Sequence, residues 1–351
     1  MRKLFVKWIL WPFAVVLGMT LVVSYGSVYV NPGRFWIPAF FGLYFVPLVI
    51  INALFLLLAL LKRSSIAWIP FLALLPTLLF VELFVRWGTH TGTESGLSVK
   101  IATYNVCNFQ GYGKKPREEA IREIDRFLHR EGVEIVCMQE FYCLDTGKIA
   151  HLFPSYPYRC FTHKKGQKSY RGNLILSTFP MEHSGEIRFL GSHRNCIYAD
   201  FSVQGRAFRV YTTHLESNNI SLNAIADRMR RYQEVPDEFL QVHRRIREAF
   251  RIRAQQVESI SEHLKTVAQP FILCGDFNDT PVSYTYNRLQ EGLTDSFRHV
   301  GNGFGATFRY LWPSLRIDYV LYNQHFTAIT HTTVPAPYSD HYPVITELII
   351  L

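Results

Sequence analysis

Three long apolar runs open the chain and distinguish its N-terminal part from the rest. Residues 8–30 and 35–61 contain no charged side chain, and residues 66–85 contain only Glu82. Each run has the ~20 residues that a helix needs to cross the hydrocarbon core of a membrane. A soluble helix of this length keeps a polar face, which these runs lack. The pattern therefore predicts three transmembrane helices over 8–30, 35–61 and 66–85, in a membrane anchor at residues 1–87.

The basic residues that flank these runs are distributed unevenly. Lys and Arg accumulate in cytoplasmic loops, so the bias predicts a multi-pass protein of the inner or plasma membrane with a cytoplasmic N-terminus. Three spans then place the C-terminal domain outside the cytoplasm, whereas a cleaved signal peptide would account for only the first run. Five residues flank the predicted cytoplasmic ends and two flank the opposite ends: Arg2, Lys3, Lys7, Lys62 and Arg63 against Arg34 and Arg86.

The pattern changes after a polar, Gly- and Thr-rich stretch at 88–97, which we interpret as a linker. Short apolar or alternating runs follow, and these are typical of β-strands. Apolar residues recur at helical spacing over Arg117–His129 and Asp237–Lys265. Many strands with few helices predict an α/β domain over 98–351, in which two sheets pack together beneath helices. The predicted strands are Ser98–Tyr104, Ile135–Gln139, Asn173–Ser177, Ile197–Val203, Arg206–Thr212, Phe271–Gly275, Ile317–Tyr322 and Thr327–Val334.

Charge is nearly balanced in this domain and unbalanced in the anchor. Residues 1–90 hold seven Lys or Arg and one Glu, whereas residues 91–351 hold 30 basic and 27 acidic residues. The strongly basic groove of many nucleic-acid binders is therefore not indicated. One long predicted helix carries Arg interleaved with Glu, which we interpret as a solvated face; the alternative is a surface for anionic headgroups or a nucleic-acid backbone. The basic residues there are Arg244, Arg245, Arg247, Arg251 and Arg253, preceded by Arg228, Arg230 and Arg231.

Polar residues gather at the ends of the predicted strands. Asn105, Glu140 and His214 each follow such a strand, where a rigid backbone presents the side chain to solvent. Singly, an Asn there is usually a turn former and a carboxylate is usually solvated. The run Gly275-Asp276-Phe277-Asn278 is more specific, because side chains at i and i+2 can share one face. Ser339-Asp340-His341 places an acid beside an imidazole in a loop between two prolines.

Six such motifs, in this order along the chain, resemble the endonuclease/exonuclease/phosphatase superfamily. That group includes DNase I, exonuclease III, neutral sphingomyelinases and inositol polyphosphate 5-phosphatases. The resemblance covers roughly residues 98–351 and implies a four-layered α/β sandwich, as in DNase I, with two packed mixed sheets flanked by helices. The motifs are Thr103-Tyr104-Asn105, Met138-Gln139-Glu140, Thr213-His214-Leu215, Gly275-Asp276-Phe277-Asn278, Arg316-Ile317-Asp318-Tyr319 and Ser339-Asp340-His341.

The resemblance implies five catalytic residues. Asp276 would orient or deprotonate the attacking water. His341 would meet the scissile phosphate, and Asp318 would fix its tautomer and raise its basicity. The remaining two would donate hydrogen bonds to phosphate oxygens: His214 and Asn278.

It also implies a metal site. Glu140 would be the principal ligand of Mg²⁺ (or Mn²⁺), with Asn105 and Asp340 assisting, which suits a cation that keeps several waters and bridges to phosphate. In-line attack on a phosphate ester builds charge on the phosphoryl and leaving oxygens, and a metal with positioned donors stabilises it. No Cys or Ser motif offers a covalent nucleophile, and none of the six cysteines has the spacing of a zinc site.

The sequence thus predicts a membrane-anchored, Mg²⁺-dependent phosphoesterase acting on phosphodiester or phosphomonoester bonds. Lipid headgroups are favoured as substrates, because an anchor raises their effective concentration. A membrane-anchored endo- or exonuclease acting on DNA or RNA is the alternative, and a non-catalytic binding module is disfavoured by the complete residue set. The predicted partners are the lipid bilayer and a phosphate-ester substrate (lipid headgroup, nucleic acid or inositol phosphate), with no obligate protein partner indicated.

Overall fold

The computed structural model describes residues 2–88, 96–110, 116–162, 168–218, 235–311 and 315–351, with the side chains of 2–7, 235–239 and 311 excluded. The predicted linker falls almost entirely outside these ranges, as do Arg228, Arg230 and Arg231. The chain forms two compact units. One contains Met1–Leu83, Ser217–Gln255 and Asp279–Arg288, and the other contains Phe84–Glu216, Gln256–Asn278 and Leu289–Leu351. Below we call them the N-terminal unit and the globular unit.

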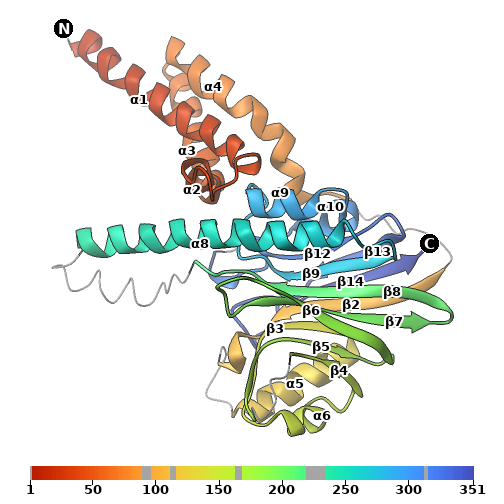
Figure 1. Ribbon diagram of the computed structural model, residues 1–351. Helices are drawn as coiled ribbons and strands as arrows, with labels where there is room; N and C mark the ends of the chain where they lie inside the picture. The colour runs from red at the N-terminus through yellow and green to blue at the C-terminus, as the bar shows by residue number, and fades with distance from the viewer. Residues whose placement is uncertain (1, 89–95, 111–115, 163–167, 219–234, 312–314) are drawn as a thin grey trace. The chain divides into compact units, whose positions relative to one another are not determined.

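Two six-stranded sheets form the globular unit (Figure 1). Their strand orders are β13-β14-β2-β3-β5-β4 and β10-β12-β9-β8-β7-β6. The first sheet contains β2 (Leu97–Asn105), β3 (Ile135–Cys143), β4 (Tyr158–Cys160), β5 (Tyr170–Ser177), β13 (Phe326–Thr333) and β14 (Val344–Ile350). The second contains β6 (Met181–Arg188), β7 (Asn195–Val203), β8 (Arg206–His214), β9 (Phe271–Asp276), β10 (Thr294–Asp295) and β12 (Asp318–Tyr322). A separate two-stranded pair consists of β1 (Val85–Arg86) and β11 (Gly303–Phe304).

Each sheet is mixed, because one parallel pair lies among antiparallel neighbours. The parallel pairs are β2 with β3 and β8 with β9. Carboxyl ends of parallel strands meet at one edge of a sheet, so each sheet gathers two strand ends there. The predicted α/β fold with two mixed sheets is confirmed.

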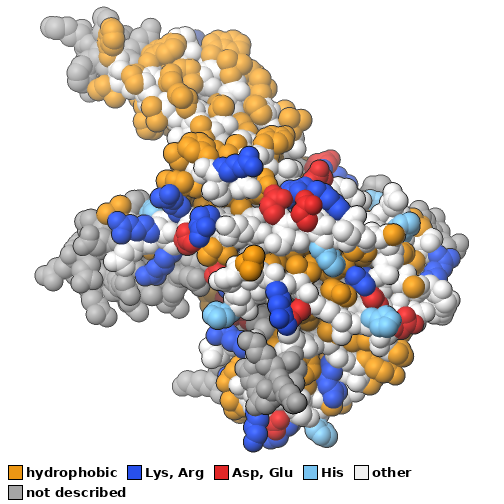
Figure 2. Space-filling model, in the orientation of Figure 1, with side chains coloured by type: hydrophobic (Ala, Val, Ile, Leu, Met, Phe, Trp, Pro, Cys, Tyr) orange, Lys and Arg blue, Asp and Glu red, His pale blue; other side chains and the backbone are white. Residues whose placement is uncertain are grey.

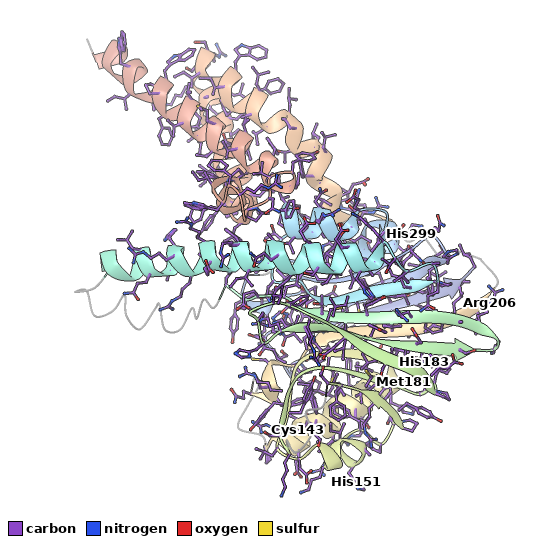
Figure 3. All side chains as sticks on the ribbon, in the orientation of Figure 1. Cys143, His151, Met181, His183, Arg206 and His299 are labelled. Carbon is purple, nitrogen blue, oxygen red and sulfur yellow. The ribbon has the colours of Figure 1, made fainter. Side chains whose placement is uncertain are left out.

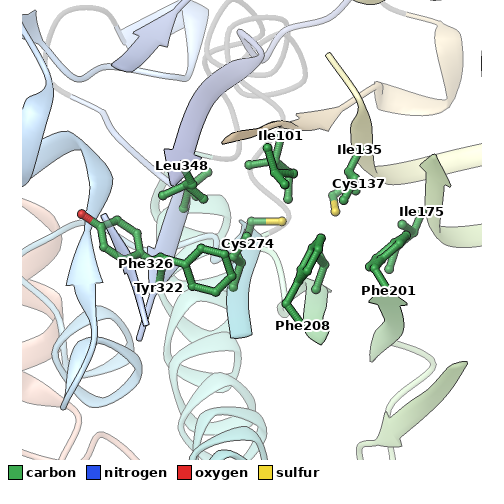
Figure 4. Packing of buried hydrophobic residues seen from close by; sticks show 14 of the residues in the cluster. Ile101, Ile135, Cys137, Ile175, Phe201, Phe208, Cys274, Tyr322, Phe326 and Leu348 are labelled. Atoms are coloured by element: carbon green, nitrogen blue, oxygen red, sulfur yellow. The ribbon is translucent and has the colours of Figure 1, made fainter. Parts of the chain in front are cut away.

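The main core lies between the two sheets (Figure 4). Ile101 and Cys137 of the first sheet contribute to the same buried cluster as Phe208 and Cys274 of the second. At one end of this interior Arg206, marked in Figure 3, donates to the carbonyl oxygen of Ile350 at 3.1 Å. The two sheets therefore pack face to face, and a polar contact joins the start of β8 to the end of β14.

A buried glutamine also joins the sheets. The Gln139 side-chain amide donates to the hydroxyl of Thr103 (3.0 Å) in its own sheet and to that of Thr212 (2.8 Å) in the other. Gln139 and both threonines are fully buried. A buried amide must be hydrogen-bonded to avoid a large desolvation cost, so these hydrogen bonds fix the position of β3 in one sheet relative to β8 in the other.

Helices cover the outer faces of the sheets. Below the first sheet, α5 (Arg117–Arg130) and α6 (Ile149–Leu152) contribute Ile121, Phe127 and Ile149 to a second buried cluster. Beside the second sheet, His263 near the end of α8 (Val235–Leu264) contacts Tyr211. Other short helices among the described residues of the globular unit are α10 (Ser296–Val300), η4 (Cys107–Phe109), η5 (Thr146–Lys148) and η6 (Arg309–Leu311), whereas most of α9 (Tyr284–Gln290) belongs to the N-terminal unit.

The N-terminal unit consists largely of apolar helices. Two continuous stretches, Trp8–Val28 and Ser65–Leu83, are long and apolar enough to cross a membrane. The helices Ile37–Leu43 and Phe45–Leu61 form a bent pair, which would make a third span if the two are counted as one. The apolar helices are α1 (Arg2–Tyr25), η1 (Gly26–Val28), α2 (Ile37–Leu43), α3 (Phe45–Leu61), η2 (Ser65–Ala67), α4 (Trp68–Leu74) and η3 (Leu75–Leu83).

The second predicted span is bent in the structure. Residues 35–61 do not form one straight helix, because α2 and α3 meet at 71° around Tyr44. Pro47 lies in the first turn of α3 and explains the break. A helix running through from α2 would need a hydrogen bond from residue 47 to the carbonyl of Leu43, and proline has no N–H and clashes there.

Candidate active site

Four strand ends bring the predicted residues together at one edge of the globular unit. Asn105 ends β2 beside Gln139 of the parallel strand β3. His214 ends β8 directly opposite Asp276, the last residue of the parallel strand β9. β12 runs antiparallel to β9 and places Asp318 opposite Asp276 as well. The register of the two sheets, and no single motif, therefore builds this site.

Asp276 is the central carboxylate. It is buried, its Oδ1 accepts a hydrogen bond from the backbone N–H of Asn278 (2.8 Å), and its Oδ2 accepts from the side-chain amide of Asn105 (2.9 Å). Burial and the neighbouring Asp318 carboxylate together outweigh the opposing effects of His341 and the two hydrogen bonds, and they raise the pKa of Asp276 to about 7. A carboxylate with a pKa near neutrality is suited to accept a proton from water.

His341 and Asp318 form a buried pair beside it. Nδ1 of His341 lies 2.9 Å from Oδ2 of Asp318, and Nε2 lies 3.8 Å from Oδ2 of Asp276. Burial alone would lower the pKa of His341, but the carboxylates of Asp318 and Asp276 outweigh burial and raise it to about 10. The ring packs edge-on against Phe308, with 5.2 Å between centroids. The imidazolium is thus held in one orientation, with Nε2 toward the strand ends.

Glu140 reaches the site through an irregularity in β3. The pairing of β3 with β5 shifts register between Met138 and Phe141, and Glu140 has a φ of 51°. Such a bulge redirects a side chain relative to the regular strand. Oε2 of Glu140 accepts a hydrogen bond from the Asn108 amide (3.0 Å), and Oε1 lies 3.6 Å from Nε2 of His214. The strained backbone is held by tertiary contacts and presents this carboxylate to the site.

His214 is in contact with the guanidinium of Arg194. Burial lowers the pKa of His214 well below its ordinary value, and Arg194 and His341 lower it further, so the ring is neutral. Nη1 of Arg194 lies 2.6 Å from Nδ1 of His214, and its Nε lies 3.4 Å from a carboxylate oxygen of Glu216. Nε2 of His214 lies 3.6 Å from Oδ2 of Asp276. A neutral imidazole therefore lies beside the central carboxylate, and the guanidinium of Arg194 lies beside that imidazole.

The loop before β14 supplies Asp340. The Ser339 hydroxyl donates to the carbonyl oxygen of Asn105 (2.7 Å) and lies 3.2 Å from Oδ1 of Asp340.

Asn278 has a φ of 53°, and its side-chain amide donates to the carbonyl oxygen of Leu215 at 3.0 Å. In this arrangement the Asn278 amide ties the loop after β9 to the end of β8.

Gly275 is required by close packing. Its φ is +140°, and a Cβ built there would lie 2.0 Å from the carbonyl oxygen of Thr213 on the neighbouring strand. Only glycine avoids both the strain and the clash. The glycine therefore lets β9 approach β8 closely enough for Asp276 and His214 to face each other.

The donor set suits a hard divalent cation. Carboxylate oxygens of Glu140 and Asp340 are the ligands that Mg²⁺ and Mn²⁺ prefer. Asp276, Asp318 and His341 also form a group whose potential ligand atoms lie within 4.8 Å of one another. Oδ1 of Asp318 is buried with no hydrogen-bond partner among the described residues, which marks a site for a positive or donating group. The chemistry of both groups therefore fits a metal.

The structure places all eight predicted site residues at this edge, with two differences in orientation. The Asn105 side chain is engaged with Asp276 and with the backbone N–H of Cys107, and Asn278 is engaged with Leu215. Sequence reasoning missed four neighbours because none of them belongs to the six motifs. They are Asn108, Arg171, Arg194 and Glu216; Arg171 lies 4.0 Å from Glu140.

Two family profiles match parts of the chain. Residues 102–341 match the profile of the endonuclease/exonuclease/phosphatase family, and residues 6–84 match a domain of unknown function (DUF8431). No curated protein matches the chain.

Solved structures show a similar fold. An endonuclease/exonuclease/phosphatase from Beutenbergia cavernae is 19% identical with a TM-score of 0.54, over 72% of each chain. The human Nocturnin catalytic domain, solved with a bound sulfate anion, is 18% identical with a TM-score of 0.54, over 73% of this chain and 97% of that one. A mannosyl-6-phosphatase from Bacteroides thetaiotaomicron is 17% identical with a TM-score of 0.50, over 72% and 100%.

Proposed function

Because the chain belongs to the endonuclease/exonuclease/phosphatase family, we propose that it is a divalent-metal-dependent phosphoesterase held at a membrane. The observation that carries this proposal is the convergence of Asp276, His341 and Glu140 at one edge of two mixed sheets. Members of the family are phosphoesterase hydrolases, which act through an attacking water and need no covalent enzyme intermediate.

Each residue has a separate task in the proposed reaction. Asp276 accepts the proton of the attacking water, whose oxygen forms the new bond to phosphorus as the ester oxygen leaves. His341 donates a hydrogen bond from Nε2 to a phosphoryl oxygen, and Asp318 positions its ring through Nδ1. His214 donates to a second phosphoryl oxygen, and Asn278 positions the loop after β9. Donors fixed in advance stabilise charge that develops in the transition state.

Glu140 and Asp340 would hold the metal, with Asn105 beside them. A divalent cation bound there supplies Lewis-acid stabilisation of the phosphoryl and leaving oxygens. The described contacts of Asn105 assign it a second task, since its amide fixes the Asp276 carboxylate at 2.9 Å. Mg²⁺ is the proposed ion and Mn²⁺ a functional substitute, because both take oxygen ligands.

We predict unequal effects of removing the two members of the His341–Asp318 pair. His341→Ala should lower kcat by about 10²- to 10⁴-fold, as expected for a direct participant in proton transfer or transition-state stabilisation. Asp318→Ala should lower kcat by about 10- to 100-fold, because it removes only the group that positions the ring. Steady-state kinetics of both purified variants test this, with thermal unfolding to verify folding. An Asp318→Ala defect as large as that of His341→Ala would assign Asp318 a direct role.

We predict that Arg194 contributes mainly to substrate binding. Its guanidinium lies beside His214 and can form charge-assisted hydrogen bonds to a phosphate. Arg194→Gln should raise KM by about tenfold and leave kcat within a few-fold, because the contact is made equally in ground and transition states. Arg188→Gln is the matched control, since Arg188 is 83% exposed on β6. A defect confined to kcat would contradict this assignment.

The anchor is proposed to leave the globular unit outside the cytoplasm. Two or three apolar stretches support membrane insertion, and the five-to-two bias of flanking basic residues supports the orientation. C-terminal fusions test the orientation in cells: alkaline phosphatase should be active and green fluorescent protein dark. The reverse pattern would mean a cytoplasmic enzyme, and nucleotides or cytosolic inositol phosphates would then become the favoured substrates.

Lipid headgroups are the proposed substrates, and nucleic acid is the second candidate. A site tethered at a bilayer meets headgroups at high effective concentration, and the near-neutral charge balance of residues 91–351 disfavours tight duplex binding. The test incubates the full-length chain and Mg²⁺ with panels of phospholipids, DNA, RNA and inositol phosphates. Release of headgroup phosphate supports the first candidate, cleavage of nucleic acid alone supports the second, and no turnover of any panel would support a binding module.

A further inference from the structure

The apolar helices of the N-terminal unit pack directly against the first half of α8. Ala39 of α2 forms a buried cluster with Ile246 and Phe250 of α8, with Phe40 and Val242 packed at its edge. The ring centroids of Phe40 and His243 are 5.0 Å apart. These residues all belong to the same compact unit. The first half of α8 is therefore fixed to the end of the apolar helices where α1 ends and α2 begins.

A stripe of arginines runs along α8 beside this contact. Arg244, Arg247 and Arg251 follow at i, i+3 and i+7, which places them on one flank of the helix, and all three are exposed. The Arg247 guanidinium lies 5.5 Å from the centre of the Trp36 ring, at the start of α2. Arg34, two residues before Trp36, is also exposed. One basic surface thus joins α8 to the turn that precedes α2.

The described carboxylates neutralise only part of this positive charge. Glu248 pairs with Arg251 at 2.6 Å. Among the described side chains, no carboxylate forms an ion pair with Arg34 or Arg244. Arg247 contacts the Trp36 ring, and its charge also acts on the neighbouring Glu248 carboxylate, whose closer partner is Arg251. At least three positive charges therefore face outward next to the apolar helices.

Aromatic side chains lie between the apolar helices and the arginines. Tyr29 is 77% exposed and Phe35 is 52% exposed, in the turn between α1 and α2. Figure 2 shows the orange apolar surface of the N-terminal helices giving way to blue Lys and Arg side chains where these helices meet α8. The order of apolar, aromatic and basic side chains matches that of hydrocarbon, interface and headgroups in a bilayer.

We propose that this surface, formed by Arg34, Trp36, Arg244 and Arg247, binds the phosphate groups of anionic phospholipids. The inference rests on the proposed membrane insertion of the apolar helices and is independent of the hydrolytic reaction. It replaces the earlier interpretation of the α8 arginines as a solvated face. A nucleic-acid backbone is the poorer fit, because the arginines adjoin the long apolar helices, whose exposed hydrocarbon surface suits lipid chains. The first half of α8 then lies within the headgroup layer.

Native mass spectrometry of the full-length chain in detergent tests the proposal. With equimolar phosphatidylglycerol and phosphatidylcholine added, the unmodified chain should retain phosphatidylglycerol by about fivefold over phosphatidylcholine. The triple variant Arg34→Gln/Arg244→Gln/Arg247→Gln should retain the two lipids equally, and the corresponding Arg→Lys triple variant should keep the preference. The control Arg122→Gln/Arg126→Gln/Arg130→Gln removes the same charge from exposed positions of α5 and should behave like the unmodified chain.

Three results would overturn the proposal: no preference in the unmodified chain, an unchanged preference in the Gln triple variant, or an equal loss in the α5 control. Thermal unfolding of each variant verifies that it is folded. Alkaline carbonate extraction of membranes separates this failure from failure of the anchor. A chain that stays in the pellet without a lipid preference would contradict only the headgroup site, whereas an extracted chain would contradict membrane insertion itself.

Discussion

Asp276→Asn is expected to lower kcat by about 10²- to 10⁴-fold and to change KM by no more than a few-fold. The substitution keeps the shape of the side chain but removes the group that accepts the proton of water. In the native protein the Asn105 amide donates to Oδ2 of Asp276 at 2.9 Å. The new asparagine side chain has one oxygen and one NH₂ group, so it can accept hydrogen bonds at only one of the two positions where the aspartate accepted them. Steady-state kinetics over a range of substrate concentrations measure the effect.

Asp145→Asn is the matched control for this variant. Asp145 caps the short helix η5, where its side chain accepts from the backbone N–H of Gly147 at 3.0 Å. Asparagine caps a helix about as well as aspartate, so activity and stability should be unchanged. Near-normal turnover by a folded Asp276→Asn protein would remove the proposed base and with it the mechanism.

The eight predicted residues could be identified from the sequence because they lie at or near strand ends. Asn105, His214 and Asp276 each follow an apolar run that is a strand in the structure. Parallel pairing then aligns β2 with β3 and β8 with β9, so residues far apart in the chain meet at one edge. Local pattern and motif order therefore predicted both the two-sheet fold and the residues gathered there.

Other features depend on tertiary packing and left no local signal. Glu140 turns into the site through a bulge that only the pairing with β5 reveals. Arg194 precedes β7 as one basic residue among many, and its approach to His214 depends on the β7–β8 pairing. The edge strand β6 has a largely polar sequence, in which partly buried and exposed side chains do not alternate regularly. In each case the partner, and not the residue's own neighbours in the chain, determines the conformation.

The N-terminal helices illustrate the same limit. Hydropathy identified the apolar runs, but the break at Tyr44 follows from Pro47 and from the packing of α2 on α8. The α8 arginines read as a solvated face when only the intervening glutamates are considered. Contact with Trp36 and the apolar helices changes that interpretation. Charge patterning on a helix therefore needs the helix's neighbours before a function can be assigned.

Glu140→Gln is expected to abolish metal-dependent turnover while the fold survives. The side chain is 24% exposed and its nearest cationic side chain, Arg171, is 67% exposed, so loss of the Glu140 charge should cost little stability. A neutral amide oxygen is a far weaker ligand for Mg²⁺ than a carboxylate. Calorimetric titration with Mn²⁺ should show affinity reduced by about tenfold or more, and turnover should stay near background at saturating Mg²⁺. Glu182→Gln, at an exposed position of β6, is the control for lost charge.

The same titration distinguishes the two acidic groups of the site. Asp276, Asp318 and His341 are close enough to bind a cation without Glu140. Asp318→Asn should leave Mn²⁺ affinity nearly unchanged if Glu140 is the principal ligand, because Asp318 then acts only on His341. Weakened Mn²⁺ binding by Asp318→Asn, with normal binding by Glu140→Gln, would move the metal to the buried cluster. Asp276 would then be a ligand, and a different group would have to accept the proton of the attacking water.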